Sequence, residues 1–262
     1  MSDLNPVWVL LLALFAIAWW RQVRSENAGW VDVLWAACTA LFGAAFALTG
    51  QGDFLLRALT AVLYVLAYGR LALYLLRRVA RDPEEDGRYR ALRNWAGPRA
   101  PWVFGLFYLA QAGFVWLFTW PARVLAEGTL PPAWALAPGL ALWVIGQAGV
   151  RIADRQLDAF RRRPENRGRT CRDGLWRYSR HPNYFFEWLH SFTWPLLALN
   201  SPGGTLLWGF PLLVFAFLYA VTGIPHTEKQ ALRSRGNDYR RYQRTTSSFI
   251  PWRPKHESDQ HG

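Results

Sequence analysis

Long apolar runs alternate along the 262-residue chain with short polar segments that are rich in arginine. A membrane-spanning helix needs about 20 predominantly apolar residues. Seven runs come close to that length or exceed it, and they cover residues 6–20, 30–50, 54–76, 102–120, 133–150, 183–200 and 204–224. The first is short, but Trp19 and Trp20 can extend it at an interface. The pattern predicts an all-α fold, an integral membrane bundle of seven transmembrane helices.

The basic residues set the orientation predicted for this bundle. Of the 30 Lys and Arg residues, 27 fall in the segments 21–29, 77–101, 151–182 and 225–262. The opposite segments, 51–57 and 121–132, hold only Arg57 and Arg123. Because cytoplasmic loops carry the excess of Lys and Arg, we expect the N-terminus outside and the C-terminus in the cytosol. The same asymmetry explains the net charge of +12, so no nucleic acid partner is expected.

The remaining pattern predicts a single membrane domain over residues 1–262, with 253–262 as a disordered tail. Acidic residues at 82–86 predict the start of a helix that Gly97-Pro98 ends, and 228–243 predict one charged amphipathic helix. Cys38 lies in an apolar run and Cys171 in a loop, which excludes a disulfide framework. No metal-ligand spacing occurs, so no metal is expected.

One polar segment stands out, because a basic loop at 174–182 leads directly into an apolar run that carries Asn183 and Glu187. These two residues are four apart and share one face of a helix. Polar groups inside a membrane helix are costly and usually mark a functional site. The segment therefore favours an enzyme.

Other polar side chains in the apolar runs have more than one interpretation. Asp32 is either a helix-start carboxylate or part of a site. Arg70 needs an anion, and a structural salt bridge with Asp32 or Glu187 would supply one. Hydrogen bonds between helices, or packing, explain the remaining polar side chains: Gln111, Gln147 and His190.

The arginine-rich loop before Asn183 also has two interpretations. Its arginines are explained by membrane-surface electrostatics. The loop also mixes charges, amides and an aromatic ring, at Asp154, Gln156, Arg161, Asn166, Arg169 and Tyr178. That mixture suits a phosphorylated aromatic cofactor, since guanidinium groups bind phosphate and carboxylates or amides bind ribose hydroxyls.

Three stretches of the C-terminal half resemble a known family. Arg180-His181-Pro182-Asn183-Tyr184, within Gly174–Glu187, is similar to the C-terminal signature of the steroid 5α-reductase superfamily. Asp154-Arg155-Gln156-Leu157 and the segment from Glu228 to Pro251 match its cofactor loop and C-terminal pattern. Within the superfamily the chain most resembles the bacterial membrane proteins that carry an uncharacterised domain similar to 5α-reductase. The resemblance covers residues 146–252, and the N-terminal half matches only loosely.

The resemblance implies a multi-pass enzyme of the bacterial inner membrane that binds NADPH. Such an enzyme reduces the carbon–carbon double bond of an apolar α,β-unsaturated ketone, such as a 3-oxo-Δ4 steroid, that enters from the lipid bilayer. Helices in 1–130 would then face the substrate, and 131–252 would bind the cofactor. The implied cofactor contacts are Asp154, Arg161, Arg169, Tyr178, Asn183 and Tyr239.

The implied catalytic residues lie in both halves of the chain. Asp32, with Tyr68 or Tyr64, would polarise the ketone, and Glu187 would lie near the nicotinamide or the substrate. The same His-Pro-Asn-Tyr pattern also resembles membrane methyltransferases that modify isoprenylcysteine or phospholipids with S-adenosylmethionine. The arginine-rich loop favours a cofactor with phosphates, which S-adenosylmethionine lacks. A non-enzymatic lipid-binding membrane protein is the third alternative.

Overall fold

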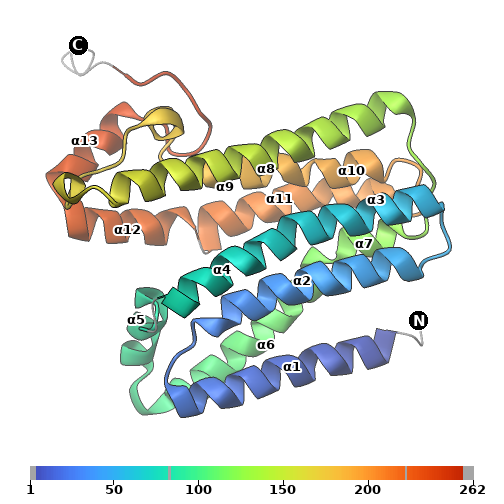
Figure 1. Cartoon of the computed structure of the whole chain (residues 1–262), viewed down its shortest axis with the longest axis horizontal. Coiled ribbons are helices and arrows are strands. Elements are labelled where there is room, and N and C mark those ends of the chain that lie inside the picture. The colour runs from blue at the N-terminus through green and yellow to red at the C-terminus, as the bar shows by residue number, and fades with distance from the viewer. Residues whose placement is uncertain (1–3, 82–83, 222, 256–262) are drawn as a thin grey trace. The chain divides into compact units, whose positions relative to one another are not determined.

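The computed structural model describes residues 4–81, 84–221 and 223–255, and over these residues the chain forms helices and no strand. The all-α prediction is confirmed. The chain divides into two compact units, Met1–Leu130 and Pro131–Gly262. The first runs from blue to green in Figure 1 and the second from green to red. The single membrane domain, and the roles given to its two halves, remain predictions.

The first unit consists of apolar helices joined by short polar turns. Its elements are α1 (Leu4–Ser25), α2 (Trp30–Thr49), α3 (Phe54–Tyr64), the π-helical η1 (Val65–Gly69), α4 (Arg70–Arg81), α5 (Gly87–Ala96), the 3-10 turn η2 (Gly97–Arg99), α6 (Ala100–Phe118) and α7 (Trp120–Leu125). Asp86 caps α5 by accepting a hydrogen bond from the Arg88 backbone, and Gly97 ends it with a φ of 54°. The helix predicted between the third and fourth runs is therefore confirmed.

Within this unit α2 packs on α3, α4 and α6, and α1 packs on α6. Tyr89 of α5 contributes its ring to a buried cluster with Phe104 of α6 and Phe15 of α1. Two long-range hydrogen bonds fix helix ends inside this core. The Trp19 indole donates to the Pro101 carbonyl at 2.8 Å, and the Tyr64 hydroxyl donates to the Phe118 carbonyl at 2.8 Å.

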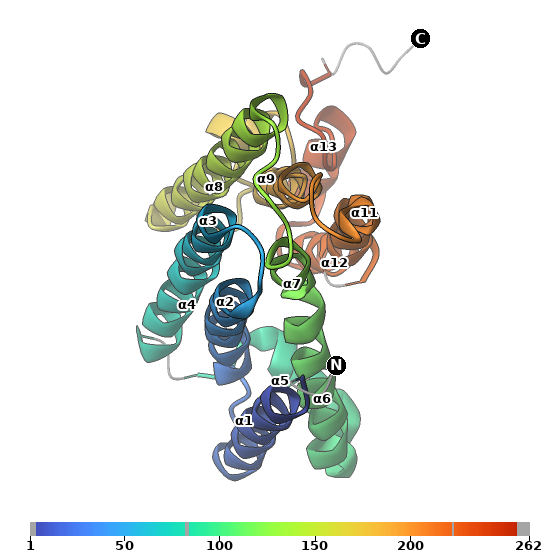
Figure 2. The same cartoon turned by 90° about the vertical axis from the view of Figure 1, so that its right-hand side faces the viewer.

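The second unit begins with one long helix, which is followed by shorter ones. Its elements are α8 (Ala133–Arg161), η3 (Pro164–Asn166), η4 (Gly174–Arg177), α9 (Pro182–Ser191), α10 (Thr193–Leu197), η5 (Gly204–Trp208), α11 (Gly209–Ala216), the π-helical η6 (Phe217–Val221), α12 (Ile224–Arg235) and α13 (Asn237–Thr245). Helix α9 lies between α8 and α11, as Figure 2 shows with the helices seen nearly end on.

Helices α8 and α9 approach closely because glycine lines the contact. A Cβ at Gly146 would overlap with His190, and a Cβ at Gly149 would overlap with the Phe186 ring. Further along, the Thr193 hydroxyl donates to the Gly139 carbonyl at 3.0 Å. Residue numbers rise along α8 while those of their partners fall, so the two helices are antiparallel. This register places the C-terminal part of α8 against the start of α9.

Among the residues that the structure describes, five helical segments are long and apolar enough to cross a membrane: Pro6–Ser25, Trp30–Thr49, Phe54–Arg81, Gly87–Leu125 and Ala133–Arg161. They match the first five predicted spans and support a multi-pass membrane protein. The last two predicted spans coincide with shorter helices. The span 183–200 is divided into α9 and α10 at Phe192, and the span 204–224 contains the short apolar helix Gly204–Tyr219. Seven spans and their orientation stay predictions.

The polar C-terminal part differs from its prediction in one respect. Residues 228–243 do not form one helix, because Gly236 adopts a φ of 52° between α12 and α13. A positive φ suits glycine and ends a helix. Of the predicted disordered tail, residues 256–262 lie outside the described part of the chain.

Candidate functional site

The signature segment turns sharply into α9. Pro182 occupies the first helical position, where its missing N–H costs nothing, and His181 precedes it with an extended φ of −137°. The Arg180 backbone N–H donates to the Ser247 carbonyl at 2.9 Å, which joins this turn to the segment after α13. Asn183 and Glu187 both fall on α9, as the sequence predicts.

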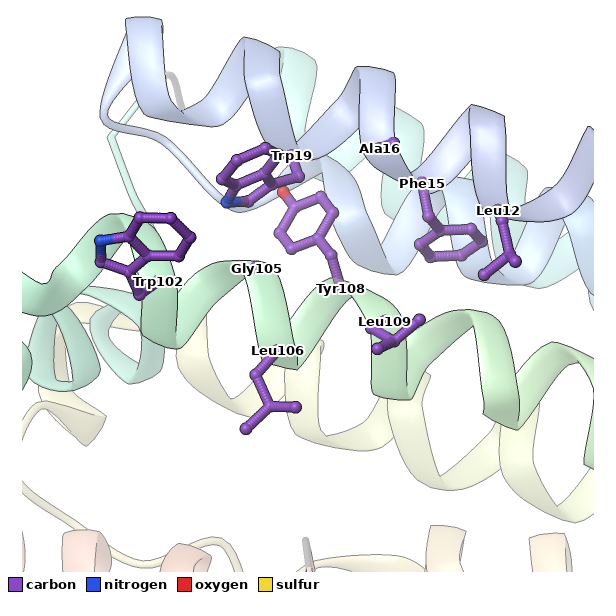
Figure 3. A pocket seen from close by; sticks show the side chains of 9 residues that line it. All are labelled: Leu12, Phe15, Ala16, Trp19, Trp102, Gly105, Leu106, Tyr108 and Leu109. Atoms are coloured by element: carbon purple, nitrogen blue, oxygen red, sulfur yellow. The ribbon is translucent and has the colours of Figure 1, made fainter. Parts of the chain in front are cut away.

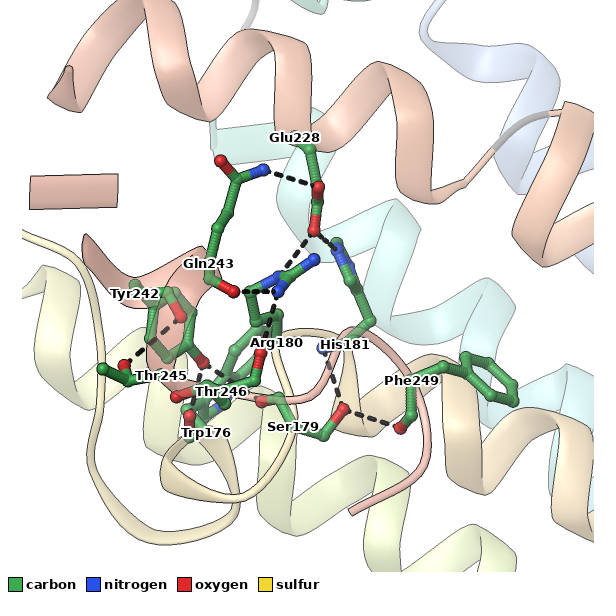
Figure 4. Close-up of polar contacts among 10 residues, drawn as sticks. All are labelled: Trp176, Ser179, Arg180, His181, Glu228, Tyr242, Gln243, Thr245, Thr246 and Phe249. Atoms are coloured by element: carbon green, nitrogen blue, oxygen red, sulfur yellow. Dashed lines mark hydrogen bonds and ion pairs between the residues drawn. The ribbon is translucent and has the colours of Figure 1, made fainter. Parts of the chain in front are cut away.

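Arg180 and His181 meet the carboxylate of Glu228 from α12. The Arg180 Nε donates to Glu228 Oε1 at 2.7 Å, and His181 Nε2 lies 3.2 Å from the same oxygen. The Gln243 amide donates to Oε2 at 2.8 Å (Figure 4). Burial alone would raise the pKa of Glu228, but hydrogen bonds from these partners and the Arg180 charge lower it to about 2. Glu228 is an ionised carboxylate bound on both oxygens.

The same cluster holds the signature segment against the C-terminal helices. The Arg180 guanidinium also donates to the carbonyls of Gln243 and Thr246, at 2.9 and 2.8 Å. The Ser179 hydroxyl donates to the Phe249 carbonyl at 2.7 Å, and the Tyr242 hydroxyl donates to the carbonyls of Ser179 and Trp176. We interpret this dense, satisfied network as the scaffold of the site.

Asp154 and Asn183, two predicted cofactor contacts, come together across α8 and α9. The Asn183 side-chain amide donates to Asp154 Oδ1 at 3.2 Å. The loop that follows α8 is fixed beside them, since Gln156 Oε1 accepts from the Leu175 N–H and the Trp176 indole donates to the Ala153 carbonyl, each at 2.8 Å. Gln156 therefore orders the loop.

Glu187 lies one turn further along α9, beside His190. The His190 Nδ1 contacts the Glu187 carbonyl at 2.7 Å and lies 4.0 Å from its carboxylate. Within the described residues, His190 Nε2 is buried without a hydrogen-bond partner, and so are Gln147 Oε1 and Trp143 Nε1. Buried polar atoms are normally paired, so these three are available to a polar group that enters this part of the unit.

The other predicted cofactor contacts of this unit are dispersed. Arg161 and Arg169 are exposed at the end of α8 and in the loop after it. Tyr178 is 41 % exposed and borders a shallow cavity of about 460 Å³ with Trp252. Tyr239 is buried in α13.

In the first unit, Asp32 lies in the first turn of α2 and binds two side chains of α5. The Tyr89 hydroxyl donates to Oδ1 at 2.6 Å, and the Arg88 guanidinium donates to Oδ2 at 3.0 Å. The helix-start position matches one interpretation of Asp32. Arg88 forms an ion pair with Asp32, whereas the sequence had suggested Arg70 as a partner of Asp32.

The tyrosines predicted to act with Asp32 make other contacts. Tyr64 donates its hydroxyl to the Phe118 carbonyl, and its ring stacks on Tyr68 with centroids 5.6 Å apart. The hydroxyl bonded to Asp32 is therefore that of Tyr89, for which no site role was predicted from the sequence. The sequence signal that could have identified Tyr89 is the Arg88-Tyr89 pair, which follows the helix-capping Asp86 by two and three residues.

The first unit also holds an apolar groove of about 440 Å³ between α1 and α6 (Figure 3). Trp19, Trp102 and Tyr108 carry its polar groups. The other lining residues are apolar or glycine: Leu12, Phe15, Ala16, Gly105, Leu106 and Leu109. Its size falls within the range of about 300–1,000 Å³ typical of small-ligand sites.

Among the side chains that the structure describes, no three His, Cys, Asp or Glu residues gather in one place. Fold and site together define a helical, multi-pass membrane protein with a polar site at the start of a short helix. The chain matches the family described as "Protein of unknown function (DUF1295)" over residues 18–246. The match covers most of the chain, which therefore belongs to this family. Neither the curated proteins nor the solved structures contain a match.

Proposed function

We propose that the protein is an NADPH-dependent reductase of the steroid 5α-reductase type, which reduces the double bond of an apolar α,β-unsaturated ketone. The observation that carries the proposal is the pairing of Asp154 with Asn183 at the start of α9. Asp154 and Asn183 belong to separate sequence motifs, and the resemblance implies that both contact the cofactor. In the structure they are hydrogen-bonded to each other. The apolar groove of the first unit agrees with an apolar substrate that enters from the bilayer.

The donor chemistry of the second unit fits a dinucleotide with phosphates. Arg161 and Arg169 form no ion pair with any described residue, so their guanidinium groups are available to phosphate. Asp154 and Arg161 are seven residues apart on α8, which puts them on one helix face about 10 Å from each other. Nicotinamide and phosphate groups of one extended cofactor can be held along such a face.

In the proposed reaction, NADPH would supply a hydride for the β-carbon of the double bond and would leave as NADP⁺, and a proton from the solvent would complete the reduction at the α-carbon. Asn183 would hold the nicotinamide carboxamide or its ribose, with Asp154 fixing the orientation of its amide. Glu187, one turn along α9, would face the nicotinamide or the substrate. His190 and Gln147 offer unpaired polar atoms in the same unit.

Charge also develops on the ketone oxygen as the hydride arrives, and a hydrogen-bond donor there lowers the barrier. Asp32 is the proposed centre of that function. Its Tyr89 partner, together with Tyr64 and Tyr68, supplies the candidate hydroxyl donors. The proposal includes the remaining expectations: seven spans, a cytosolic C-terminus and a location in the bacterial inner membrane.

The test is turnover in proteoliposomes. NADPH oxidation is followed with testosterone, progesterone and a panel of unsaturated lipid ketones, and the product is examined by mass spectrometry. A product with two added hydrogen atoms supports the proposal. Transfer of a methyl group from S-adenosylmethionine to a lipid acceptor would replace it with the methyltransferase alternative, and lipid binding without either reaction would favour the non-enzymatic one.

A further inference from the structure

Arg235, near the end of α12, is a half-buried cation that no carboxylate pairs with among the described residues. Its guanidinium lies over the Tyr239 ring, 5.0 Å from the centroid. Burial lowers the pKa of Arg235, and the nearby charge of Arg161 acts in the same direction, while Tyr239 and the charge of Asp238 act in the opposite one. The fold thus holds two guanidinium groups as neighbours, an arrangement that favours an anion between them.

Thr170 and Arg172 approach the same place from the loop after α8. The Thr170 backbone N–H donates to Asp238 Oδ2 at 2.7 Å. Its hydroxyl is buried without a hydrogen-bond partner, and the residue is only 6 % exposed. Arg172 donates through Nη2 to Asp238 at 2.8 Å, while its buried Nε has no partner. Two polar groups are therefore left available.

Packing brings these elements to the end of α8. Cys171, between Thr170 and Arg172, is buried against Ala153, with Leu157 and Phe160 of α8 beside it. Arg161 is the next residue along that helix, so the loop and the helix end meet. The charges of both Arg161 and Arg235 act on Cys171.

The charges at this place do not balance. Arg172 and Arg235 act on the carboxylate of Asp238, and Arg161 lies near Arg235. One carboxylate oxygen of Asp238 is already bound by Arg172 and the other by Thr170, so this carboxylate is used within the loop. Guanidinium forks and a hydroxyl donor are the groups that bind phosphate oxygens best.

We propose that Thr170 and Arg235, with Arg161 and Arg172, form a subsite for a phosphate monoester. The inference rests on the proposed function in one respect, the source of the phosphate. In NADPH the only monoester is the 2′-phosphate of the adenosine, which distinguishes it from NADH. The subsite would then confer the preference for NADPH, with the nicotinamide about two turns of α8 away at Asp154 and Asn183.

Binding by the full-length protein in nanodiscs tests the subsite, with NADPH and NADH titrated in parallel. We expect Arg235→Ala to weaken NADPH binding by about tenfold and to leave NADH binding nearly unchanged. Thr170→Val should cause a smaller loss in the same direction. Arg233→Ala, an exposed arginine of the same helix, is the matched control and should change neither. Equal effects of Arg235→Ala on NADPH and NADH would overturn the subsite.

If Arg235→Ala does not fold, Arg235→Lys is measured in its place, because lysine keeps the positive charge but cannot form bidentate hydrogen bonds. We then expect an intermediate loss of NADPH affinity. An affinity equal to that of the wild type would count against bidentate binding of phosphate at this position.

Adenosine 2′-phosphate and phosphatidic acid separate the two proposals and the two sources of phosphate. If adenosine 2′-phosphate binds in an Arg235-dependent way while neither dinucleotide does, the subsite stands and the reductase falls. If NADPH and NADH bind equally and Arg235→Ala has no effect, the subsite falls and the reductase stands. Binding of phosphatidic acid alone, in vesicles with phosphatidylcholine, would overturn the assignment to a nucleotide.

Discussion

Asp32 in the first unit and Glu228 in the second are both carboxylates held by an arginine and a second side chain, yet their surroundings differ. Glu228 is bound on both oxygens by Arg180, His181 and Gln243, and its side chain is 15 % exposed. Asp32 is also bound on both oxygens, but by two side chains: Tyr89, and Arg88, whose side chain is 47 % exposed and also contacts Asp86.

The difference indicates different tasks. A charge that is fully paired and shielded from water stabilises the fold and leaves no room for a substrate. A carboxylate with fewer partners at a helix start can exchange one of them. We therefore assign Glu228 to structure and Asp32 to the proposed chemistry, and each assignment can be tested by removing a partner.

The largest effect is expected from removing Arg180. Arg180→Ala leaves Glu228 without its closest partner and frees the carbonyls of Gln243 and Thr246. Loss of one member of a buried ion pair costs about 3–5 kcal/mol. Thermal unfolding in detergent should show this loss, whereas Arg177→Ala, at an exposed position nearby, should change stability by less than about 0.5 kcal/mol. A small effect of Arg180→Ala would contradict the structural role of the cluster.

The pH dependence of stability gives the next largest effect. The pKa of Glu228 is lowered from 4.5 to about 2 in the folded state, so its contribution is complete above about pH 4.5 and is lost as the pH falls toward 2. The shift corresponds to about 3 kcal/mol. The free energy of unfolding, measured with denaturant between pH 2 and 6, should therefore fall less steeply toward acid pH in Glu228→Gln than in the wild type. Equal slopes would show that Glu228 is not held ionised.

A smaller loss should follow from filling the glycine contact that positions the start of α9. Gly146→Ala introduces a methyl group that overlaps with His190 and the Phe186 carbonyl. Overpacking of this kind costs about 1–3 kcal/mol. Gly113→Ala in α6 is the control, because nothing lies within 4 Å of the added atom, and it should be neutral or stabilise by up to about 1 kcal/mol. If the two variants melt alike, the close approach of α8 and α9 is wrong.

The smallest effect in free energy concerns Asp32. If the protein is a reductase, Asp32→Asn should lower single-turnover rates with saturating NADPH by about tenfold, or about 1.4 kcal/mol of barrier, with NADPH affinity little changed. Tyr89→Phe removes the hydroxyl that Asp32 accepts and should lower the rate as well. Glu187→Gln is expected to lower turnover by about the same factor. Full activity of Asp32→Asn would remove Asp32 from the mechanism.

The periodic features of the fold could be predicted from the sequence, because long apolar runs and helix caps depend on neighbouring residues. The helices through 161 and the caps at Asp86 and Gly97 are examples. The breaks at Phe192 and Gly236 were missed, since a short apolar helix and a long one look alike in hydropathy and a single glycine is often tolerated in a helix.

The site was predictable only where its residues belong to one motif. Asn183 and Glu187 share α9, and Asp154 was identified by its own motif. The partners of Glu228 and Asp32 depend on contacts between residues about 50 positions apart, such as Arg180 with Glu228 and Tyr89 with Asp32. No local pattern encodes such a pairing, which is why Tyr89 received no role.

Binding of NADPH by the second unit, proposed at the start of α9, can be measured by calorimetric titration of the purified protein. We expect NADPH to bind the wild type, Asn183→Ala to weaken binding by about tenfold or more, and Asn94→Ala, at an exposed position of the first unit, to have no effect. Binding of S-adenosylmethionine in place of NADPH, or NADPH binding that is unchanged in Asn183→Ala, would contradict the proposed binding.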